Sequence, residues 1–475
     1  MQIELKYGTM KRYLLTILLS LWCACAWAAG SVTVKGRVLC GGRGVEGVWV
    51  SDGEEFACTD KRGNYRLQAG ADNRFVFVCV PAGYDAPVEK GVVRYFHPLP
   101  ADGKSCDFTL LRRAGDDSRY GFIAIADPQI WAPKEFAKLA AAADDIAATV
   151  RSYGGMPFHG ICCGDIVSHD HSLYGRYNEV MERTGITFRN AMGNHDMKVY
   201  GRSYETSFSK FEQMYGPVYY SFDVGRIHYV VLDDNFFIGR DYFYIGYLEE
   251  RQMRWLEKDL ARVQPGSTVV VCLHIPSTCE EQDRKQFRYD RAGSTMTNHR
   301  GLYEILKPYR AHIISGHTHT TFNQSIAPGL YEHVTPALSG AWWQGPLCTD
   351  GTPAGYGVYE VNGDRIDWYY KSTGYPADYQ MKIYSGREYP QFEGYAVANI
   401  WASDGVPCGP AERFQAYDPA AKQMYSDTSQ MDHKWIYPSI SDHYYRVALP
   451  EGAKRVEVSA TDRFGRISRA AADLK

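Results

Sequence analysis

The sequence has 475 residues, of which 45% are apolar, and it carries a formal net charge of −3 at pH 7. At roughly 150 residues per domain, this length predicts two to four domains rather than one. The nearly balanced charge lacks the basic excess that polyanion binding needs, so no nucleic-acid partner is expected. The 36 tyrosines favour a β-rich protein.

The N-terminus has the three parts of an export signal. Lys11 and Arg12 provide positive charge, residues 13–22 are apolar, and Ala26-Trp-Ala28 provides a small-x-small cleavage site. We predict that residues 1–28 are a cleaved signal peptide and that the protein is exported, to the periplasm or outside the cell, free or attached to the surface. The alternative, a transmembrane anchor, is disfavoured because no stretch approaches about 20 uninterrupted apolar residues.

An oxidising compartment would permit disulfides among Cys40, Cys58, Cys79 and Cys106, although their pairing cannot be inferred from spacing. No pair of cysteines has the spacing of a zinc site. Cys162-Cys163 lies in an apolar run, which predicts buried thiols that act as small hydrophobic side chains.

Residues 31–113 are predicted to form a small β-sandwich. Residues 32–39 alternate with period two, and further short apolar runs follow at glycine-rich turns. Gly47-Val-Trp-Val-Ser-Asp-Gly53 and Thr59-Asp-Lys-Arg-Gly-Asn-Tyr65 resemble the carboxypeptidase-regulatory-like sandwich. The segment carries no evident chemistry, so we interpret it as a structural or spacing module.

Residues 117–373 are predicted to form an α/β domain, because strand-length apolar runs alternate with helical patterns. The expected helices are 134–151, 174–183, 208–214 and 248–263. After residue 319 strands predominate, and Asn362-Gly363 predicts a hairpin turn. Residues 374–475 are predicted to form a third, all-β domain.

Five apolar runs of the central segment end in tight polar turns. Ligand sites of α/β folds form beyond the carboxyl ends of strands, which is where these turns are predicted to lie. The turns are Asp127-Pro-Gln129, Gly164-Asp165, Gly193-Asn194-His195-Asp196, His274 and Gly316-His317-Thr-His319.

The residue types in these turns match a pair of divalent cations. Carboxylates, amide oxygens and imidazoles without thiolates suit Mn, Fe or Zn better than Ca, and do not match a closed structural zinc site. Each turn alone has an ordinary structural explanation, such as a strand-end turn or a satisfied core histidine. All five in this order are much harder to attribute to chance.

The five turns resemble the calcineurin-like metallophosphoesterase superfamily, with its D-x-[HQ], GD, GNH[DE], H and GHxH motifs, over about residues 120–373. The resemblance implies a four-layer α/β/β/α sandwich, here in an exported form with accessory β-domains at both ends. It also implies that one metal ion is held by Asp127, Gln129, Asp165 and His319. The second would be held by Asp165, Asn194, His274 and His317, with Asp165 bridging the two ions.

The chain departs from the commonest pattern of this family at two positions. Gln129 replaces the usual histidine, as in an Asp-Pro-Gln branch of the family, and its oxygen favours Mn or Fe over Zn at that position. Ser168 stands where the protein Ser/Thr phosphatases of the superfamily carry an aspartate that pairs with the catalytic histidine, and their phosphate-binding arginine is absent. A simple protein-phosphatase assignment is therefore disfavoured.

The function that these features predict is hydrolysis of phosphate esters, either monoesters or diesters, by a hydroxide that bridges the two metal ions. His195 is expected to protonate the leaving group or to stabilise charge, with Asp196 or Asp170 orienting it. Trp342 and Trp343 could form an aromatic wall for a small phosphorylated substrate, or could pack between domains. Phe243 and Tyr244, expected in a loop with Tyr242, could serve similarly.

The alternative function is an exported, non-enzymatic protein that binds a glycan or a protein partner through its β-domains. The complete set of seven candidate ligands favours the enzyme, because all the required roles can be filled. The sequence leaves open the substrate, the native metals and the oligomeric state.

Overall fold

The computed structural model describes residues 30–100, 104–115, 117–198, 201–239, 243–278, 292–386, 389–402, 404–426 and 438–474. The predicted signal peptide, residues 1–28, lies outside these ranges. Among the described residues, no helix combines the length and the apolarity that a membrane crossing requires. The chain divides into two compact units. The first contains the residues up to Val78 together with Phe96–Leu110, and the second contains Cys79–Tyr95 together with the residues from Leu111 onward.

The first unit consists of two small sheets. In one sheet β1 pairs with β2, β5 and β11, and the other sheet has the order β10-β6-β3-β4. The period-two pattern of residues 32–39 forms β1, whose inward side chains Val34 and Val38 are fully buried. Its strands are β1 (Ser31–Cys40), β2 (Arg43–Gly44), β3 (Trp49–Ser51), β4 (Phe56–Cys58), β5 (Asn64–Gly70), β6 (Phe75–Cys79), β10 (Phe96–Pro98) and β11 (Phe108–Arg112).

The cysteines that the sequence offered for disulfides are free thiols in the structure, namely Cys40, Cys58, Cys79 and Cys106. Cys162 and Cys163 are buried, as predicted.

The second unit is built on two mixed sheets. The first has the order β14-β13-β12-β23-β24, and the second has the order β15-β16-β19-β20-β22-β21. Strands β12, β13 and β14 run parallel to one another, and so do β16, β19, β20 and β22. The strands of the first sheet are β14 (Phe188–Asn190), β13 (Phe158–Cys162), β12 (Arg119–Ile125), β23 (Gly355–Asn362) and β24 (Arg365–Ser372). Those of the second are β15 (Tyr220–Val224), β16 (Ile227–Val231), β19 (Thr268–Cys272), β20 (Arg310–Ser315), β22 (Leu330–Val334) and β21 (Phe322–Ala327).

The two sheets pack face to face through an aromatic layer. Phe122 of β12 stacks on Tyr359 of β23 at 4.4 Å between ring centroids, and meets Tyr229 of β16 edge-on at 5.6 Å. His159 of β13 lies edge-on to Phe222 of β15 and to Tyr229. This layer fixes the distance between the sheets, and so the distance between the two sets of strand ends.

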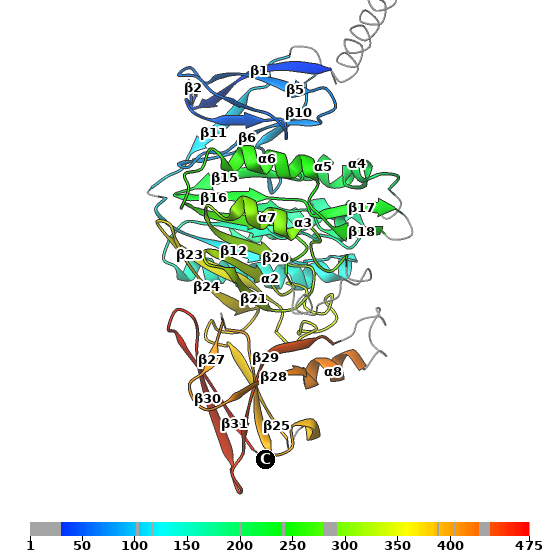
Figure 1. Ribbon diagram of the computed structural model, residues 1–475, viewed down its shortest axis with the longest axis vertical. Helices are drawn as coiled ribbons and strands as arrows, with labels where there is room; N and C mark the ends of the chain where they lie inside the picture. The colour runs from blue at the N-terminus through cyan, green and yellow to red at the C-terminus, as the bar shows by residue number, and fades with distance from the viewer. Residues whose placement is uncertain are drawn as a thin grey trace, which may run out of the picture. The chain divides into compact units, whose positions relative to one another are not determined.

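Helices cover the outer faces of both sheets (Figure 1). Leu139 and Ile146 of α2 share a core cluster with Ile123 and Ile125 of β12. On the other side, Asp259 of α6 accepts hydrogen bonds from residues of β15 and β16, so α6 is fixed to the second sheet. The main helices are α2 (Phe136–Ser152), α3 (Tyr174–Met181), α4 (Tyr204–Ser207), α5 (Ser209–Tyr215), α6 (Glu250–Leu260) and α7 (His299–Leu306). The predicted α/β domain with two stacked sheets and outer helices is confirmed.

One local expectation is wrong. Phe243 and Tyr244, expected in a loop, begin β18 (Phe243–Gly246), which forms a hairpin with β17 (Asn235–Gly239). The aromatic side chains give the strand its propensity, and the polar residues that separate the two strands in the sequence hid the pairing. The unit also contains the short strands β7 (Tyr84–Asp85), β8 (Val88–Glu89) and β9 (Val92–Val93).

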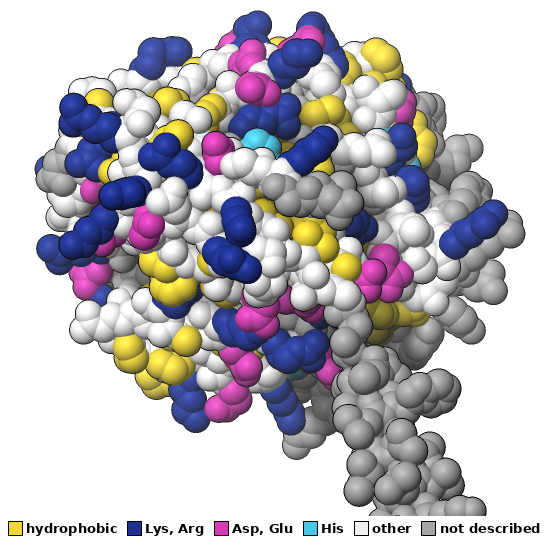
Figure 2. Space-filling model, turned by 90° about the horizontal axis from the view of Figure 1, so that it is seen from above, with side chains coloured by type: hydrophobic (Ala, Val, Ile, Leu, Met, Phe, Trp, Pro, Cys, Tyr) yellow, Lys and Arg dark blue, Asp and Glu magenta, His cyan; other side chains and the backbone are white. Residues whose placement is uncertain are grey.

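The C-terminal part of this unit is β-rich, with sheets of order β25-β26-β29-β28 and β27-β30-β31. Met381, Ala398 and Ile400 pack against Ala460 between the two sheets. This part also contains helix α8 (Pro419–Ser426), which the all-β prediction did not include. Figure 2 shows the molecule from above the view of Figure 1, and on that face acidic side chains lie among the basic ones. The strands are β25 (Met381–Ser385), β26 (Tyr395–Ile400), β27 (Val406–Pro407), β28 (Glu412–Tyr417), β29 (Ile440–Ala448), β30 (Arg455–Thr461) and β31 (Ile467–Asp473).

Candidate metal centre

The five polar turns follow strands β12, β13 and β14 of one sheet and β19 and β20 of the other, and they meet at one edge of the sandwich. Backbone hydrogen bonds join them: Asp127 N donates to Gly164 O at 3.2 Å, and Gly316 N donates to His274 O at 3.0 Å. Across the two sheets, His317 N donates to the Asp127 carboxylate at 2.9 Å. The turns therefore form one connected site rather than five separate loops.

The backbone is strained at most of the candidate ligands. Left-handed φ angles are uncommon for residues other than glycine and cluster at functional sites, because the surrounding structure must hold them. Here the left-handed positions are Asp127 (51°), Gln129 (38°), Asp165 (53°), His317 (71°) and His319 (52°). Such a concentration marks the strand ends as a site rather than as ordinary turns.

Two glycines are required by close packing in these turns. A Cβ on Gly193 would overlap the backbone nitrogen and the carboxylate of Asp165, and one on Gly316 would meet the carboxylate of Asp127. The glycines of the GNHD and GHxH motifs thus make room for the carboxylates beside them.

One group of side chains converges on His274, which is fully buried. Its Nε2 lies 3.0 Å from Asn194 Oδ1, 3.1 Å from His317 Nδ1 and 3.4 Å from Asp165 Oδ1. These are the four residues that the family resemblance assigned to one metal ion. Three of them, Asp165, His274 and His317, form a cluster of possible ligand atoms within 4.8 Å of one another.

The other group lies around Asp127 and shares Asp165 with the first. Asp127 Oδ1 lies 3.5 Å from His319 Nε2, and Gln129 Nε2 donates to Asp165 Oδ2 at 2.7 Å. Asp127 Oδ1, Gln129 Oε1 and His319 Nε2 are buried and have no hydrogen-bond partner. Orphaned buried polar atoms are costly, so three of them together fit an ion that they would coordinate.

Each candidate histidine ligand is held by a backbone carbonyl through the nitrogen that faces away from the site. Nδ1 of His274 contacts Cys163 O at 2.7 Å, Nε2 of His317 contacts Gly293 O at 2.9 Å, and Nδ1 of His319 contacts Gly340 O at 3.1 Å. The outer nitrogen must carry a proton to donate to a carbonyl, so the inner nitrogen is the one that is left to face a metal ion. This is how metal-ligating histidines are oriented in proteins.

The site has an excess of negative charge. Burial opposes ionisation of Asp165, but His274, His195 and the His195 amide outweigh it and hold the pKa of Asp165 below its ordinary value. Burial likewise opposes protonation of His274, yet Asp165 and Asp127 raise its pKa to about 10. The two buried carboxylates thus favour a positive charge beside His274, and a divalent cation would be stabilised by the same carboxylates.

His195 stands at the edge of the site. Its backbone nitrogen donates to Asp165 Oδ1 at 2.7 Å, and its Nε2 lies 4.0 Å from Asp165 Oδ2. Ser168 Oγ lies 3.3 Å from its Nδ1. Burial lowers the pKa of His195. The ring can therefore reach the space beside the carboxylate while Ser168 fixes its orientation.

Asp196 and Asp170, the two residues expected to orient His195, have other hydrogen-bond partners. Asp196 is fully buried and accepts from Gly193 N, Ile166 N, Val167 N and the Tyr174 hydroxyl. Burial and the charge of Asp165 raise the pKa of Asp196 to about 7. Asp170 caps a short 3₁₀ turn through Ser172. Asp196 thus joins the GD and GNHD turns, and the side chain at the His195 ring is Ser168.

Trp342 and Trp343 both pack against the site. The Trp342 ring stacks on His319 at 4.0 Å between centroids. Its other contacts include the Ala421 and Tyr425 cluster of α8. Trp343 is 8% exposed and donates its indole N–H to Pro128 O at 2.7 Å. Both therefore support ligand-bearing turns, and Trp342 also packs against the C-terminal region.

Sequence reasoning missed two residues beside the site. The ring of His169 lies 4.4 Å from that of His195, and burial lowers its pKa to about 4. Asp234 is fully buried and accepts from the backbone nitrogens of His274 and Ile275. The only signal for either was a polar residue close after an apolar run, at Gly164-Asp-Ile-Val-Ser-His169 and at Val231-Leu-Asp-Asp234.

Two aromatic residues of β18 lie close to histidines at the site. Phe243 lies 6.0 Å from His169, and Tyr244 lies edge-on to His317 at 6.1 Å. Tyr242 lies outside the described residues.

Three family models match the sequence in order. They describe the N-terminal part of calcineurin-like phosphoesterases over residues 32–113, the calcineurin-like phosphoesterase over residues 121–321, and the C-terminal part of calcineurin-like phosphoesterases over residues 332–467. The matches do not overlap, and together they span most of the chain. No curated protein matches the sequence.

Solved structures resemble the chain in part. A dimetal phosphatase from Danio rerio is 15% identical, covers 54% of this chain and 96% of its own length, and gives a TM-score of 0.37. A purple acid phosphatase from yellow lupin (Lupinus luteus) is 11% identical, covers 69% and 66%, and gives 0.40. A 5'-nucleotidase from Candida albicans is 12% identical, covers 55% and 53%, and gives 0.33. The chain thus spans about two thirds of the lupin enzyme and half of the nucleotidase, and the assignment of a family rests on the sequence models.

Proposed function

Because the chain belongs to the calcineurin-like phosphoesterases, we propose that it hydrolyses phosphate esters at a centre of two divalent metal ions. Asp127, Gln129, Asp165 and His319 would hold one ion. Asn194, His274 and His317 would hold the other together with Asp165. The observation that carries the proposal is the orientation of the three ligand histidines. Each has its outer nitrogen on a backbone carbonyl and its inner nitrogen beside another candidate ligand.

When bound, the two ions would polarise the phosphoryl oxygens and lower the pKa of a bound water to near neutrality. The donor set of oxygen and imidazole without thiolate suits Mn, Fe or Zn. Gln129 adds an oxygen where a histidine would add a nitrogen, so we propose that the ion beside it is Mn or Fe.

Within the protein, His195 acts on the leaving group. It lies beside Asp165, the carboxylate that the two ions would share, and Ser168 at its Nδ1 leaves Nε2 facing the site. From there it protonates the leaving oxygen or stabilises the charge that develops on it. Asp196 and Asp234 are positioning residues, because they hold the backbones of the turns that carry Asn194 and His274.

We also propose that residues 1–28 direct export to the periplasm or beyond, and that the mature chain comprises domains of residues 31–113, 117–373 and 374–475. The tripartite N-terminal pattern supports the first point. The family match over residues 32–113 supports the first domain boundary, whereas the C-terminal match begins at residue 332, ahead of the proposed boundary at 373. N-terminal sequencing of the secreted or periplasmic protein should begin just after Ala28. Recovery of the chain in the cytosol with its first residues intact would contradict export.

The proposed activity is tested with 4-nitrophenyl phosphate and bis(4-nitrophenyl) phosphate as monoester and diester probes. Hydrolysis should disappear after chelation and return on addition of Mn, Fe or Zn, with the ratio of the two rates giving the monoester or diester preference. Hydrolysis that survives exhaustive chelation, or no hydrolysis of either probe with any of the three metals, would overturn the proposal.

A further inference from the structure

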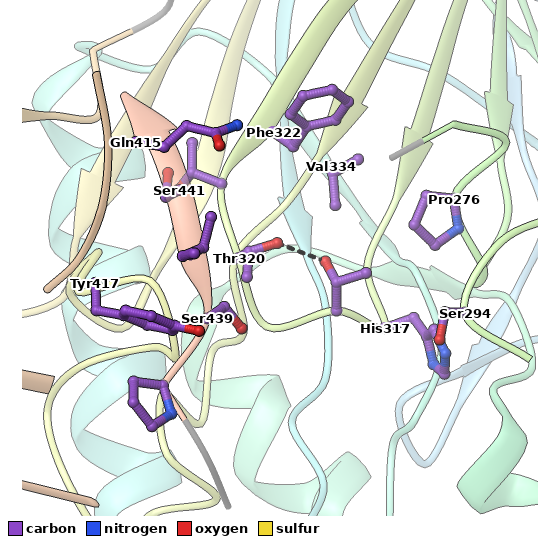
Figure 3. A pocket seen from close by; sticks show the side chains of 14 residues that line it. Pro276, Ser294, His317, Thr320, Phe322, Val334, Gln415, Tyr417, Ser439 and Ser441 are labelled. Carbon is purple, nitrogen blue, oxygen red and sulfur yellow. Dashed lines mark hydrogen bonds between the residues drawn. The ribbon is translucent and has the colours of Figure 1, made fainter. Parts of the chain in front are cut away.

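A cleft of about 570 Å³ opens beside His317 and runs to the C-terminal strands β28 and β29 (Figure 3). Its volume falls in the range of about 300–1,000 Å³ that is typical of small-molecule sites. His317 is the one candidate metal ligand among the described lining residues, so the cleft adjoins the proposed metal centre at this side chain.

The two walls of the cleft come from different parts of the second unit. Thr320 and Phe322 extend from the GHxH turn into β21, and Gln415 and Tyr417 lie on β28. In Figure 3 these side chains face one another across the opening.

Hydrogen bonds tie both walls to the Thr349–Asp350 segment, because Thr321 N, next to Thr320, donates to the Asp350 carboxylate at 2.6 Å. Ser439 N donates to Thr349 O at 2.8 Å, and His443 Nε2 lies 3.1 Å from the Asp350 carboxylate. The Tyr444 hydroxyl donates to Asp350 O at 3.0 Å. The cleft is therefore formed before any ligand arrives, which lowers the entropic cost of binding.

The described lining mixes polar and apolar side chains and has no carboxylate, ammonium or guanidinium group. It is rich in Ser and Thr hydroxyls, with the amide of Gln415 and the phenol of Tyr417, and none of the described lining residues is Asp, Glu, Lys or Arg. Hydroxyl and amide groups both donate and accept hydrogen bonds, which matches the vicinal hydroxyls of a polyol. A charged leaving group would gain no counter-charge from the described lining side chains.

Tyr417 adds an apolar platform to this lining. Its side chain is 44% exposed at the far end of the cleft from His317. An aromatic face is electron-rich and apolar, so it packs against the C–H face of a sugar ring while the neighbouring hydroxyls bond the ring's edges.

We propose that the substrate is a phosphate monoester of an uncharged sugar or polyol, and that the C-terminal strands β28 and β29 bind its leaving group; this inference rests on the proposed phosphoesterase activity. Water adds its oxygen to phosphorus, the bond from phosphorus to the leaving oxygen breaks, and the leaving oxygen takes a proton. The products are inorganic phosphate and the free sugar or polyol.

The test compares glucose 6-phosphate with 6-phosphogluconate, which has a similar carbon chain but carries a carboxylate. On the metal-loaded enzyme, kcat/KM for glucose 6-phosphate should be higher by about tenfold or more, the ratio expected for one unfavourable charged contact. Adenosine monophosphate serves as the probe for a nucleobase. A kcat/KM equal for the two hexose derivatives, or highest for adenosine monophosphate, would overturn the inference.

Tyr417→Ala should raise KM for glucose 6-phosphate about tenfold with little change in kcat, as expected for loss of a ground-state contact. Its inhibition constant for inorganic phosphate, which occupies only the metal end, should not change. Tyr375→Ala is the matched control, since Tyr375 is 45% exposed and is not part of the cleft lining. Unchanged KM in Tyr417→Ala would contradict the role of the C-terminal wall.

The two proposals fail in different ways. If 4-nitrophenyl phosphate is hydrolysed with metal but the hexose preference is absent, the substrate inference is wrong and the phosphoesterase proposal stands. If no probe is hydrolysed with any metal, the phosphoesterase proposal itself is wrong.

Discussion

The orientation of each ligand histidine at the centre is set by the group that bonds the outer nitrogen of its ring. Backbone carbonyls fix the tautomers of His274, His317 and His319, and this cannot be predicted from a motif because the carbonyl of Gly340 is distant in sequence from His319. The sequence did predict that these histidines would meet Asp127 and Asp165, since their types and strand-end positions were visible. Only the structure shows which ring nitrogen of each histidine donates to a carbonyl.

His195→Ala should leave both metal ions in place and lower kcat by about 10²–10⁴-fold, the range for loss of an acid–base group. The reason is that its side chain contacts the site without being one of the candidate ligands. Metal analysis and steady-state kinetics on the same preparation check this. Full activity in the variant would remove His195 from the mechanism.

Gln129→His should keep activity and shift the metal preference of the purified protein towards zinc, because an imidazole nitrogen replaces an amide oxygen. Competition between Zn and Mn during reconstitution, read by metal analysis, measures the shift. An unchanged Zn-to-Mn ratio would mean that Gln129 does not contact an ion.

At the scale of elements, the turns matter more than the strands. The helices at 136–152, 174–181, 209–215 and 250–260 lie within a few residues of their predicted positions, because their apolar periodicity is strong. The β17–β18 hairpin and α7 were missed, since short elements carry little periodic signal and their pairing depends on distant segments. Most of the polar turns were found because they follow an apolar run, although the strand before Gly193 contains Arg189 and Asn190.

Gly193→Ala should reduce metal binding and activity and destabilise the domain by about 1–3 kcal/mol, as overpacking does, because the new methyl group overlaps Asp165. Gly175→Ala is the matched control in α3, where an added Cβ meets nothing within 4 Å. It should be neutral or stabilising by up to about 1 kcal/mol. Urea denaturation of both variants checks the contrast. Equal stability of the two would contradict the packing argument.

For the whole molecule, the contacts between the sheets decide where the two halves of the site lie. Asp127 and Asp165 come from one sheet and His274 and His317 from the other, so the aromatic layer between them sets the ligand distances. Alternation along the sequence predicted the sheets but could not show how they face one another. It could not show Ser168 at the His195 ring or the cleft beside the C-terminal strands either, because these depend on side chains brought together from distant positions.

His159 lies in this aromatic layer, and neither of its ring nitrogens has a hydrogen-bond partner. Burial, reinforced by Arg189 and Arg113, lowers its pKa well below the ordinary value of 6.5. The unfolded chain therefore binds a proton that the folded chain does not, so His159 costs stability as pH falls below about 6.5. Above that pH the cost is absent.

His159→Phe should make the loss of stability between pH 8 and pH 5.5 smaller than in the wild type, by up to about 1.4 kcal/mol per pH unit below 6.5. Urea denaturation at the two pH values, with chelator present for both proteins, gives the difference. An equal loss in the two proteins would show that His159 is protonated in the folded state.

The proposed dinuclear centre depends most on Asp165, whose carboxylate would be shared by the two ions. The metal content of the protein tests this role directly. The wild type, reconstituted with Mn or Fe and freed of excess metal, should hold two ions per chain by plasma mass spectrometry. Asp165→Asn should lose metal and activity together, whereas Asp144→Asn, on an exposed residue of α2, should retain both. Two ions retained in Asp165→Asn, or none in the wild type, would contradict a dinuclear centre at these strand ends.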